Sequence, residues 1–343
     1  MTSHGTGART AIEAIAVALP DRVLSNDDLK KEHPDWGFER LEQRTGVFAR
    51  HIAAKGETAL DFALRACQQL EAEGRLRPDE INALIFCTQS PDYVMPPNSC
   101  ILHGKLGLPA GVMAFDITLA CSGYIYGLQL ADSLIRSGSA RRVLLATADT
   151  YSRYIHSGDR ATRCLFGDGG AVSVLSASPD GRGIRDIRCG TAGRQYEKFI
   201  IPAGGMRVTR SAETARESAD LSGNVRSAEH IRMDGIGVLS FFNATVPCSV
   251  KEILAANQLS LADVDLFVFH QASQIVLDSL RGSLAIPQGK MIYDLAEVGN
   301  LVSASIPVAL QHAFERGQAK HGQLALLCGF GVGLSWATAL VDI

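Results

Sequence analysis

One cysteine lies at a position where a thiol can act as a nucleophile. Cys121 stands in the run Leu119-Ala120-Cys121-Ser122-Gly123, after an extended apolar stretch at 112–117 and before a helix-like stretch at 124–135. The N-terminal end of a helix favours thiolate over thiol and lowers the pKa from about 8.5 toward neutrality. Cysteine is also among the most frequently buried residue types, so an inert structural role is the alternative. The position therefore predicts a nucleophile only if residues elsewhere support it.

Two polar residues in the second part of the chain lie at comparable positions. His270 follows the apolar stretch 266–269, and Asn300 follows Gly299 just before a helix-prone stretch at 303–316. Taken singly, such a histidine is more often structural, and an asparagine before a helix is more often its N-cap. Like Cys121, however, both lie at the boundary between an apolar element and a loop, where functional sites are built. The combination indicates one shared site.

The elements that must position these residues are apolar runs of strand length that alternate with helix-like runs. Continuous apolar runs suit strands that helices cover on both faces, so the predicted class is α/β with a largely buried sheet. The predicted strands are at 83–88, 112–117, 143–148, 170–175, 266–270 and 324–328.

The sequence also repeats itself. The pattern at 76–87 recurs at 259–270, and the helix-like run 128–136 with the strand 143–146 recurs at a similar offset as 307–316 and 324–327. Two echoes in the same order predict a duplicated half-domain without a solenoid period. We therefore expect two halves, 1–177 carrying the cysteine and 178–343 carrying the histidine and asparagine. The second half begins with a connecting segment, 178–231, that includes an exposed excursion at 206–230.

Composition narrows the class of protein. The chain has 343 residues with a hydrophobic content of 46%, enough for a substantial core, and a net charge of −3 with both signs interspersed. This pattern does not favour nucleic acid or an anionic membrane as a partner. We expect no apolar run of the length that a membrane span needs, and we expect a cytoplasmic location. The eight cysteines include no C-x-x-C pair, which argues against disulfides and zinc.

Five segments together carry a family resemblance. They are AFDITLACSG at 114–123, FGDGGA at 166–171, FHQA at 269–272, GN at 299–300 with SASIP at 303–307, and GFGVG at 329–333. Their order and spacing, from RTG at 44–46 to the C-terminus, resemble those of the β-ketoacyl-[acyl carrier protein] synthase III family. The resemblance implies the thiolase fold, with two βαβαβαββ halves packed in five layers, α-β-α-β-α, usually as a homodimer.

The same resemblance implies a reaction and roles for individual residues. Cys121 would take an acyl group from a thioester, while backbone N–H groups of Cys121, Gly331, Val332 and Gly333 would stabilise the oxyanion. His270 and Asn300 would donate hydrogen bonds to the enolate formed when a malonyl thioester loses carbon dioxide. The product would be a β-ketoacyl thioester.

The resemblance also implies what binds. No metal or redox cofactor is expected, since coenzyme A or a phosphopantetheine arm arrives with the substrate. The expected partners are acyl-CoA or an acyl carrier protein, a malonyl carrier protein and a second copy of the chain.

Departures from the family pattern affect the entrance to the site. Arg40 stands where the family has a tryptophan that stacks on adenine, Leu301 replaces a threonine after the asparagine, and Ile275 replaces a basic residue. Arg44 and Arg160 keep the family's nucleotide-contacting positions, and Met95 falls where the family closes the acyl tunnel across the dimer. The expected substrate-binding residues are therefore Arg44, Arg160, Arg40, Met95 and Leu301, in a specialised member of the family.

Three classes of function compete at this point. Decarboxylative condensation is favoured because all three polar residues are present. Acyl transfer from the cysteine to an alcohol or amine, without condensation, is the main alternative. A non-catalytic partner subunit is disfavoured because the nucleophile is retained.

Overall fold

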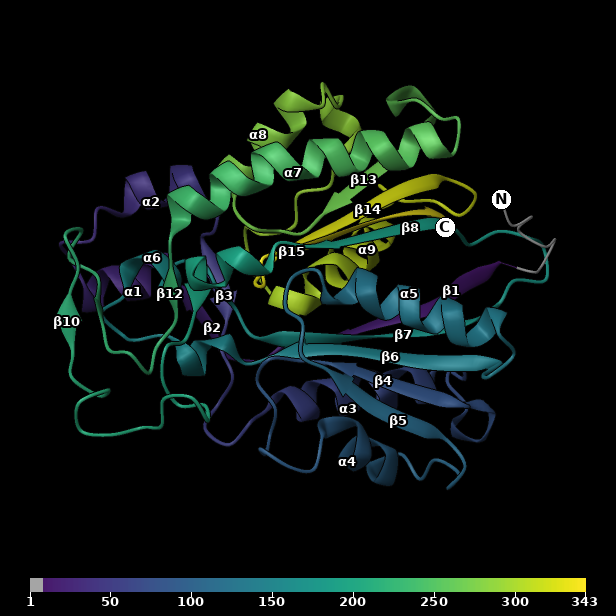
Figure 1. The fold of residues 1–343 in the computed structure, drawn as a ribbon, viewed down its shortest axis with the longest axis horizontal. Helices are drawn as coiled ribbons and strands as arrows, with labels where there is room; N and C mark the ends of the chain where they lie inside the picture. The colour runs from purple at the N-terminus through teal and green to yellow at the C-terminus, as the bar shows by residue number, and fades with distance from the viewer. Residues whose placement is uncertain (1–8) are drawn as a thin grey trace.

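Two sheets with helices between and outside them form five layers (Figure 1). The computed structural model describes residues 9–343. One outer layer contains α3 (Ala59–Ala72) and α4 (Asn98–Lys105), the central layer α5 (Gly123–Arg136) and α9 (Ser305–Glu315), and the other outer layer α7 (Gly235–Ala256) and α8 (Gln274–Ser283). The α-β-α-β-α arrangement implied by the resemblance is therefore present.

The first sheet has the strand order β1-β7-β6-β4-β5. Its strands are β1 (Thr10–Ala18), β4 (Ala83–Cys87), β5 (Met113–Ile117), β6 (Arg142–Asp149) and β7 (Gly169–Ala177). The strand β4 pairs in parallel with β5 and β6, whereas β7 is antiparallel to both β6 and β1. Helices cover both faces, which explains why the central strands are continuous apolar runs. The strand β5 is left at the edge.

The second sheet repeats this topology. Its strands are β8 (Ile184–Thr191), β13 (Leu266–Phe269), β14 (Leu324–Gly331) and β15 (Ser335–Asp342), in the order β8-β15-β14-β13. The pairs β8·β15 and β14·β15 are antiparallel and β13·β14 is parallel. An isolated parallel bridge between Phe267 and Met291 stands where the fifth strand would be. Order and direction thus match the first sheet strand for strand.

The six predicted strands correspond to β4, β5, β6, β7, β13 and β14. The pattern did not reveal β1, β8 or β15. The strand β8 falls inside the segment 178–231, which we expect to include an exposed connecting excursion, and the first part of that segment belongs to the second sheet. The predicted boundary between 177 and 178 lies between the end of β7 and the start of β8.

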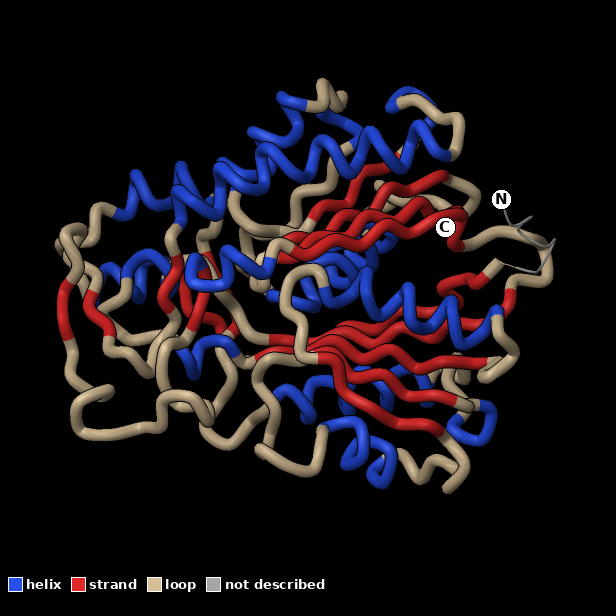
Figure 2. Tube along the Cα trace, in the orientation of Figure 1, coloured by secondary structure: helices blue, strands red, loops and turns tan. Residues whose placement is uncertain are grey.

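Most of the remaining elements are short and lie at one end of the sheets, where loops dominate (Figure 2), whereas the 3-10 turns that directly precede β4 and β13 lie at the other end. The helical ones are α1 (Asn26–Glu32), α2 (Phe38–Thr45), α6 (Arg160–Arg163) and the short 3-10 helices η1 (Pro78–Glu80), η2 (Tyr151–Tyr154), η3 (Gly193–Lys198), η4 (Leu261–Asp263), η5 (Gln288–Lys290) and η6 (Val302–Ala304). The short strands are β2 (Val23–Ser25), β3 (Ala49–His51), β9 (Phe199–Ile200), β10 (Ser218–Ala219), β11 (Val225–Arg226) and β12 (Arg232–Met233). Residues 204–223 are largely exposed, as expected for the excursion.

The helix α7 corrects one expectation. By length and composition it is apolar enough to cross a membrane, whereas we expected no run of that kind. In the fold it packs on α8 and against β8, β14 and β15, and it buries Phe242, Val246, Val250 and Ile253. Its apolar character is therefore used in covering the second sheet.

Candidate active site

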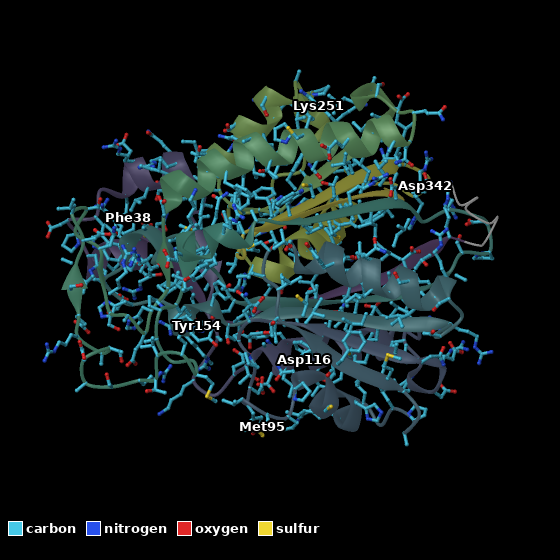
Figure 3. The ribbon with its side chains drawn as sticks, in the orientation of Figure 1. Phe38, Met95, Asp116, Tyr154, Lys251 and Asp342 are labelled. Atoms are coloured by element: carbon cyan, nitrogen blue, oxygen red, sulfur yellow. The ribbon has the colours of Figure 1, made fainter. Side chains whose placement is uncertain are left out.

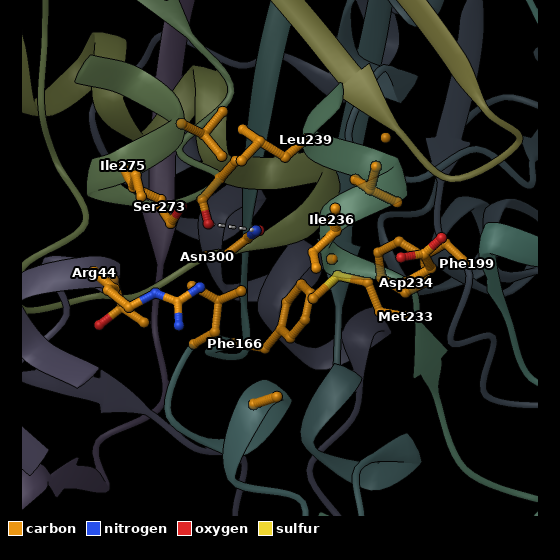
Figure 4. A pocket seen from close by; sticks show the side chains of 18 of the residues that line it. Arg44, Phe166, Phe199, Met233, Asp234, Ile236, Leu239, Ser273, Ile275 and Asn300 are labelled. Carbon is orange, nitrogen blue, oxygen red and sulfur yellow. Dashed lines mark hydrogen bonds between the residues drawn. The ribbon is translucent and has the colours of Figure 1, made fainter. Parts of the chain in front are cut away.

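A cavity of about 500 Å³ gathers the three predicted residues from both halves. Cys121, His270 and Asn300 all line it, together with Phe330 and Gly331 from the end of β14. Figure 4 shows Asn300 among the lining residues, between Arg44 on one side and Met233 and Phe199 on the other. The structure therefore brings the sulfur, the imidazole and the carboxamide to one place.

The position of Cys121 follows from the first sheet and the central helix. The strand β5 ends at Ile117, α5 begins at Gly123, and the thiol between them is only 4% exposed. The hydroxyls of Ser122 and Ser335 lie 2.8 Å apart, and Ser335 Oγ donates to the carbonyl of Val332 at 2.8 Å. These bonds join the start of α5 to the turn after β14. The backbone N–H groups of Cys121 and Val332 act on the sulfur to lower the pKa of the thiol.

The pKa of the Cys121 thiol is not lowered as we expected. Burial raises it well above its ordinary value, and the nearby carboxylate of Asp149 raises it further. The two N–H groups at the sulfur act in the opposite direction but do not compensate. The helix N-terminus therefore does not determine the protonation state of Cys121, because desolvation of the buried sulfur outweighs its effect.

Two glycines let the turn after β14 approach the nucleophile. A Cβ at Gly331 would lie 2.6 Å from the Cβ and 2.7 Å from the sulfur of Cys121. A Cβ at Gly329 would lie 2.7 Å from the Cys121 carbonyl oxygen. Any side chain here would push the main chain away from the sulfur. The glycine segment thus serves close approach of the backbone.

His270 follows β13 and is buried, with 2% of its surface exposed. Its main-chain N–H donates to the carbonyl of Cys328 at 2.8 Å, and its ring packs edge-on against Phe330. Burial lowers the pKa of the imidazole to about 3, so the ring is neutral near pH 7. Within residues 9–343 its Nδ1 atom has no hydrogen-bond partner, whereas its Nε2 atom lies 3.3 Å from the amide nitrogen Nδ2 of Asn300. An amide nitrogen can only donate, so this contact favours the tautomer whose proton is on Nδ1.

Asn300 is held from several sides. Its main chain bridges to Phe166, with its N–H donating to Leu165 O at 2.9 Å and its carbonyl accepting from Gly167 N at 3.0 Å. Its Oδ1 accepts the N–H of Val302 at 2.9 Å, which fixes the amide so that Nδ2 faces His270. The Nδ2 atom also donates to the carbonyl of Ala272 at 3.4 Å.

The two side chains offer a paired donor site. Nδ2 of Asn300 and Nε2 of His270 lie 3.3 Å apart. With an oxygen acceptor bound between them and the imidazole proton moved to Nε2, both nitrogens can donate to that oxygen, and neither carries a charge. Two donors at this separation can share one oxygen acceptor in the cavity that also contains the sulfur.

Asp149 is a residue that the sequence analysis missed. It ends β6 and is 1% exposed. Its carboxylate accepts from Ser303 Oγ at 2.5 Å, Gln89 N at 2.8 Å and Thr88 Oγ1 at 3.2 Å. Burial raises its pKa to about 6 against the effect of these donors. The signal was available, because Asp149 ends an apolar strand just as His270 follows one.

Asp149→Asn is expected to make Cys121 more reactive. At pH 7 to 8 the carboxylate is ionised and opposes formation of the thiolate, so a neutral isostere should lower the thiol pKa. The measurement is the rate of Cys121 alkylation by iodoacetamide as a function of pH. Rates for the variant should exceed those of the wild type at pH 8 and converge with them below about pH 6, where Asp149 is protonated.

Asp132→Asn is the matched control for that experiment. Asp132 is also a buried aspartate, but it lies in the middle of α5 beside Arg136. Its replacement should leave the alkylation profile unchanged. Equal profiles for the wild type and Asp149→Asn would show that Asp149 does not influence the thiol.

Of the other predicted substrate-binding residues, two line the cavity and three do not. Arg44 and Arg160 line the cavity, and Arg160 also donates to Ser222 O at 3.2 Å. Arg40 is exposed and does not line it. Met95, 79% exposed, lies outside the cavity at the edge of the molecule (Figure 3).

Leu301, also expected to bind substrate, does not line the cavity. Its side chain is 1% exposed and packs with Val298, Ala304 and Val308 in an apolar cluster away from the cavity. Its N–H donates to Ser305 Oγ at 3.0 Å, close to the start of α9. The residue therefore supports the backbone after Asn300 and does not line the cavity.

The five layers and the buried cysteine beside a histidine and an asparagine define a thiolase-fold protein with a thiol at its central cavity. Comparison with known proteins then gives the family. Residues 115–193 match the family model for 3-oxoacyl-[acyl-carrier-protein] synthase III, and residues 254–343 match the model for its C-terminal part. The chain belongs to the β-ketoacyl-[acyl carrier protein] synthase III family.

Individual relatives resemble this chain over nearly its whole length. The β-ketoacyl-[acyl-carrier-protein] synthase III of Campylobacter concisus is 36% identical and aligns over 97% of this chain and 96% of the relative. A crystal structure of a 3-oxoacyl-(acyl-carrier-protein) synthase III is 43% identical, with a TM-score of 0.95 over 98% of this chain and 100% of that one. The enzyme from Pseudomonas aeruginosa PAO1 is 31% identical, with a TM-score of 0.85 over 97% and 98% of the two chains.

Proposed function

We propose that the protein catalyses decarboxylative condensation of an acyl thioester with a malonyl thioester, with Cys121, His270 and Asn300 as its catalytic residues. The relatives are named for this activity. The observation that supports the assignment of residues is that the Asn300 amide nitrogen and the uncharged His270 imidazole lie 3.3 Å apart in the cavity that contains the Cys121 sulfur.

The first step is transfer of the acyl group to the enzyme. The sulfur of Cys121 attacks the thioester carbonyl, the carbon–sulfur bond of the donor breaks, and the thiol proton ends on the departing thiol. We propose that the N–H groups of Cys121 and Val332, which favour the thiolate of Cys121, also stabilise the oxyanion of this step. Each such donor contributes roughly 3 kcal/mol to stabilisation of a transition state. Gly331 and Gly333 complete the turn that presents Val332.

The second step makes the carbon–carbon bond. The malonyl thioester loses carbon dioxide, and the electron pair of the broken bond forms an enolate whose oxygen accepts from His270 and Asn300. Its carbon attacks the acyl group on Cys121, which releases the β-ketoacyl thioester and returns the sulfur as a thiol after protonation. A neutral imidazole suits this role, because its N–H can donate a hydrogen bond while no positive charge has to be buried in the cavity.

The proposal includes the partners expected from the resemblance. The acyl donor is acyl-CoA or an acyl carrier protein, the extender is a malonyl carrier protein, and no metal or redox cofactor takes part. Arg44 and Arg160, which line the cavity, are proposed to contact the donor's phosphate groups. A cytoplasmic location belongs to the same proposal.

A homodimer is proposed from the exposed edge of the first sheet. The strand β5 has a partner on one side only, and its first residue, Met113, is 47% exposed. Next to it, the start of α4 is bound to Asp116 of β5, and the loop before α4 exposes Tyr93, Val94 and Met95. An exposed apolar strand edge invites pairing with another chain.

The alternative, acyl transfer to an alcohol or amine, is not favoured, since the relatives carry the names of condensing enzymes. The test is a carbon balance with malonyl carrier protein labelled in its free carboxyl group. We expect one labelled carbon dioxide for each β-ketoacyl product. Product formation from an acyl donor and an alcohol or amine, without release of label, would establish the alternative instead.

Met95→Trp is expected to shorten the longest acyl chain that the enzyme accepts. In the proposed dimer Met95 reaches toward the partner's acyl site, so a larger side chain would occupy part of that space. The measurement is the chain-length profile of products from a series of straight-chain acyl-CoA donors. Val94→Trp, at the neighbouring exposed position, is the control and should keep the wild-type profile. An unchanged profile for Met95→Trp would remove this role.

A further inference from the structure

A second cavity of about 600 Å³ lies beside the catalytic centre. It is bounded by the loop after β4, by η2, by the segment around β9 and by the turn after β14. None of its lining residues is charged. They are Gln89, Pro91, Thr118, Tyr151, Tyr154, Tyr196, Phe199, Ile200, Ile201, Ile231, Val332 and Gly333.

This cavity is placed to receive a group attached to Cys121. Val332 lines it, and the residue before Val332, Gly331, lies so close to Cys121 that an added Cβ would be 2.7 Å from the sulfur. Phe199 lines both this cavity and the one that contains Cys121. A thioester arm in the first cavity and an acyl group in the second would therefore meet at the sulfur.

The polar groups of the second cavity are organised around Gln89. Tyr151 donates its hydroxyl proton to Gln89 Oε1, and Tyr154 donates to the Gln89 carbonyl at 3.2 Å. Gln89 Nε2 donates to Thr118 O at 3.3 Å. After these bonds, one N–H of Gln89 and lone pairs on both phenol oxygens are still available.

These polar groups make binding of an unsubstituted alkyl chain in the second cavity less favourable. Such a chain would remove water from a carboxamide N–H and two phenol oxygens without replacing the hydrogen bonds. A hydroxyl can accept from the N–H and donate to a phenol oxygen. A site built to hydrogen-bond a substrate oxygen discriminates strongly against an analogue that lacks it.

The surroundings also disfavour an anionic acyl group. The carboxylate of Asp149 accepts the main-chain N–H of Gln89 at 2.8 Å, so a negative charge already lies behind the wall of the cavity. Burial, with Asp149 next in importance, raises the pKa of Tyr151 well above its ordinary value, which keeps that phenol protonated and neutral.

We propose that the second cavity holds the acyl group of the acyl-enzyme and selects an uncharged acyl group that carries a hydroxyl. The proposal rests on the proposed function, because it assumes that Cys121 is acylated. It assigns Gln89 and Tyr151 as specificity-determining residues.

The test compares matched donors at the acylation step. Hexanoyl-CoA, 3-hydroxyhexanoyl-CoA and 6-hydroxyhexanoyl-CoA are each mixed with the enzyme, and acyl-Cys121 is followed by intact-protein mass spectrometry. At least one hydroxylated donor should acylate Cys121 about tenfold faster than hexanoyl-CoA, as expected for one added hydrogen bond. Gln89→Leu and Tyr151→Phe should each reduce this preference severalfold. Tyr126→Phe, which alters a phenol on α5 outside both cavities, should keep it.

The outcomes separate the two proposals. Absence of acyl-Cys121 with all three donors would overturn the proposed function and this assignment with it. Acylation in which hexanoyl-CoA reacts as fast as both hydroxylated donors would overturn the assignment alone. A preference that survives both Gln89→Leu and Tyr151→Phe would also overturn it.

Discussion

Cys121→Ala is expected to abolish both acyl-enzyme formation and β-ketoacyl product, with kcat/KM falling on the order of 10⁴-fold or more. The variant removes the only atom that forms a covalent bond to the acyl group in the proposed reaction. The side chain is small and 4% exposed, so its loss leaves a small cavity and the fold should persist. Intact-protein mass spectrometry after addition of acyl-CoA measures the first effect, and product formation measures the second.

Cys248→Ala provides the matched control for that result. Cys248 is an exposed cysteine on α7 that lines neither cavity. Its removal should leave acylation and turnover at the wild-type level. Acylation of Cys121→Ala at the wild-type rate would show that another residue is the nucleophile.

The parts of the fold that could be predicted are those in which sequence pattern and burial coincide. The strands β4 and β14 are buried along their whole length, so each is a continuous apolar run. The strand β8 is an edge strand whose Arg185, Asp186 and Arg188 form ion pairs, and its pattern is therefore not apolar. In β15 the polar residue Thr338 interrupts the apolar pattern. It can nevertheless be buried, because its hydroxyl is hydrogen-bonded to Ser249 Oγ at 2.9 Å.

The candidate site could be predicted in location but not in electrostatics. Cys121, His270 and Asn300 all lie at element boundaries, which are visible in the sequence. The pKa of the thiol depends instead on how deeply packing buries it and on Asp149, which lies 28 residues further along the chain. Leu301 was assigned to the cavity by family position, whereas its backbone conformation directs the side chain into the core. Distances between segments and the depth of burial are properties of the packed fold.

The second large effect is expected when either His270 or Asn300 is replaced. His270→Ala and Asn300→Ala are each expected to slow malonyl decarboxylation by about 10²- to 10³-fold, while acylation of Cys121 changes much less. The reason is that both side chains are proposed to bind the enolate, which forms only in the second step. The measurement separates the steps, with mass spectrometry of acyl-Cys121 for the first and release of labelled carbon dioxide for the second.

The pH dependence gives an independent test of the same pair. Because burial holds the pKa of His270 at about 3, the imidazole stays neutral as the pH falls from 8 to 5, and decarboxylation by the acylated enzyme should show no loss of rate near the usual histidine pKa of about 6.5. A fall in rate centred at 6.5 that disappears in His270→Gln would mean that the ring titrates normally and is not desolvated as the structure describes.

Equal loss of acylation and decarboxylation in Asn300→Ala would contradict a role confined to the enolate. The division of labour between a buried sulfur and two uncharged donors thus depends on burial, because the same desolvation that raises the pKa of the thiol keeps the imidazole neutral.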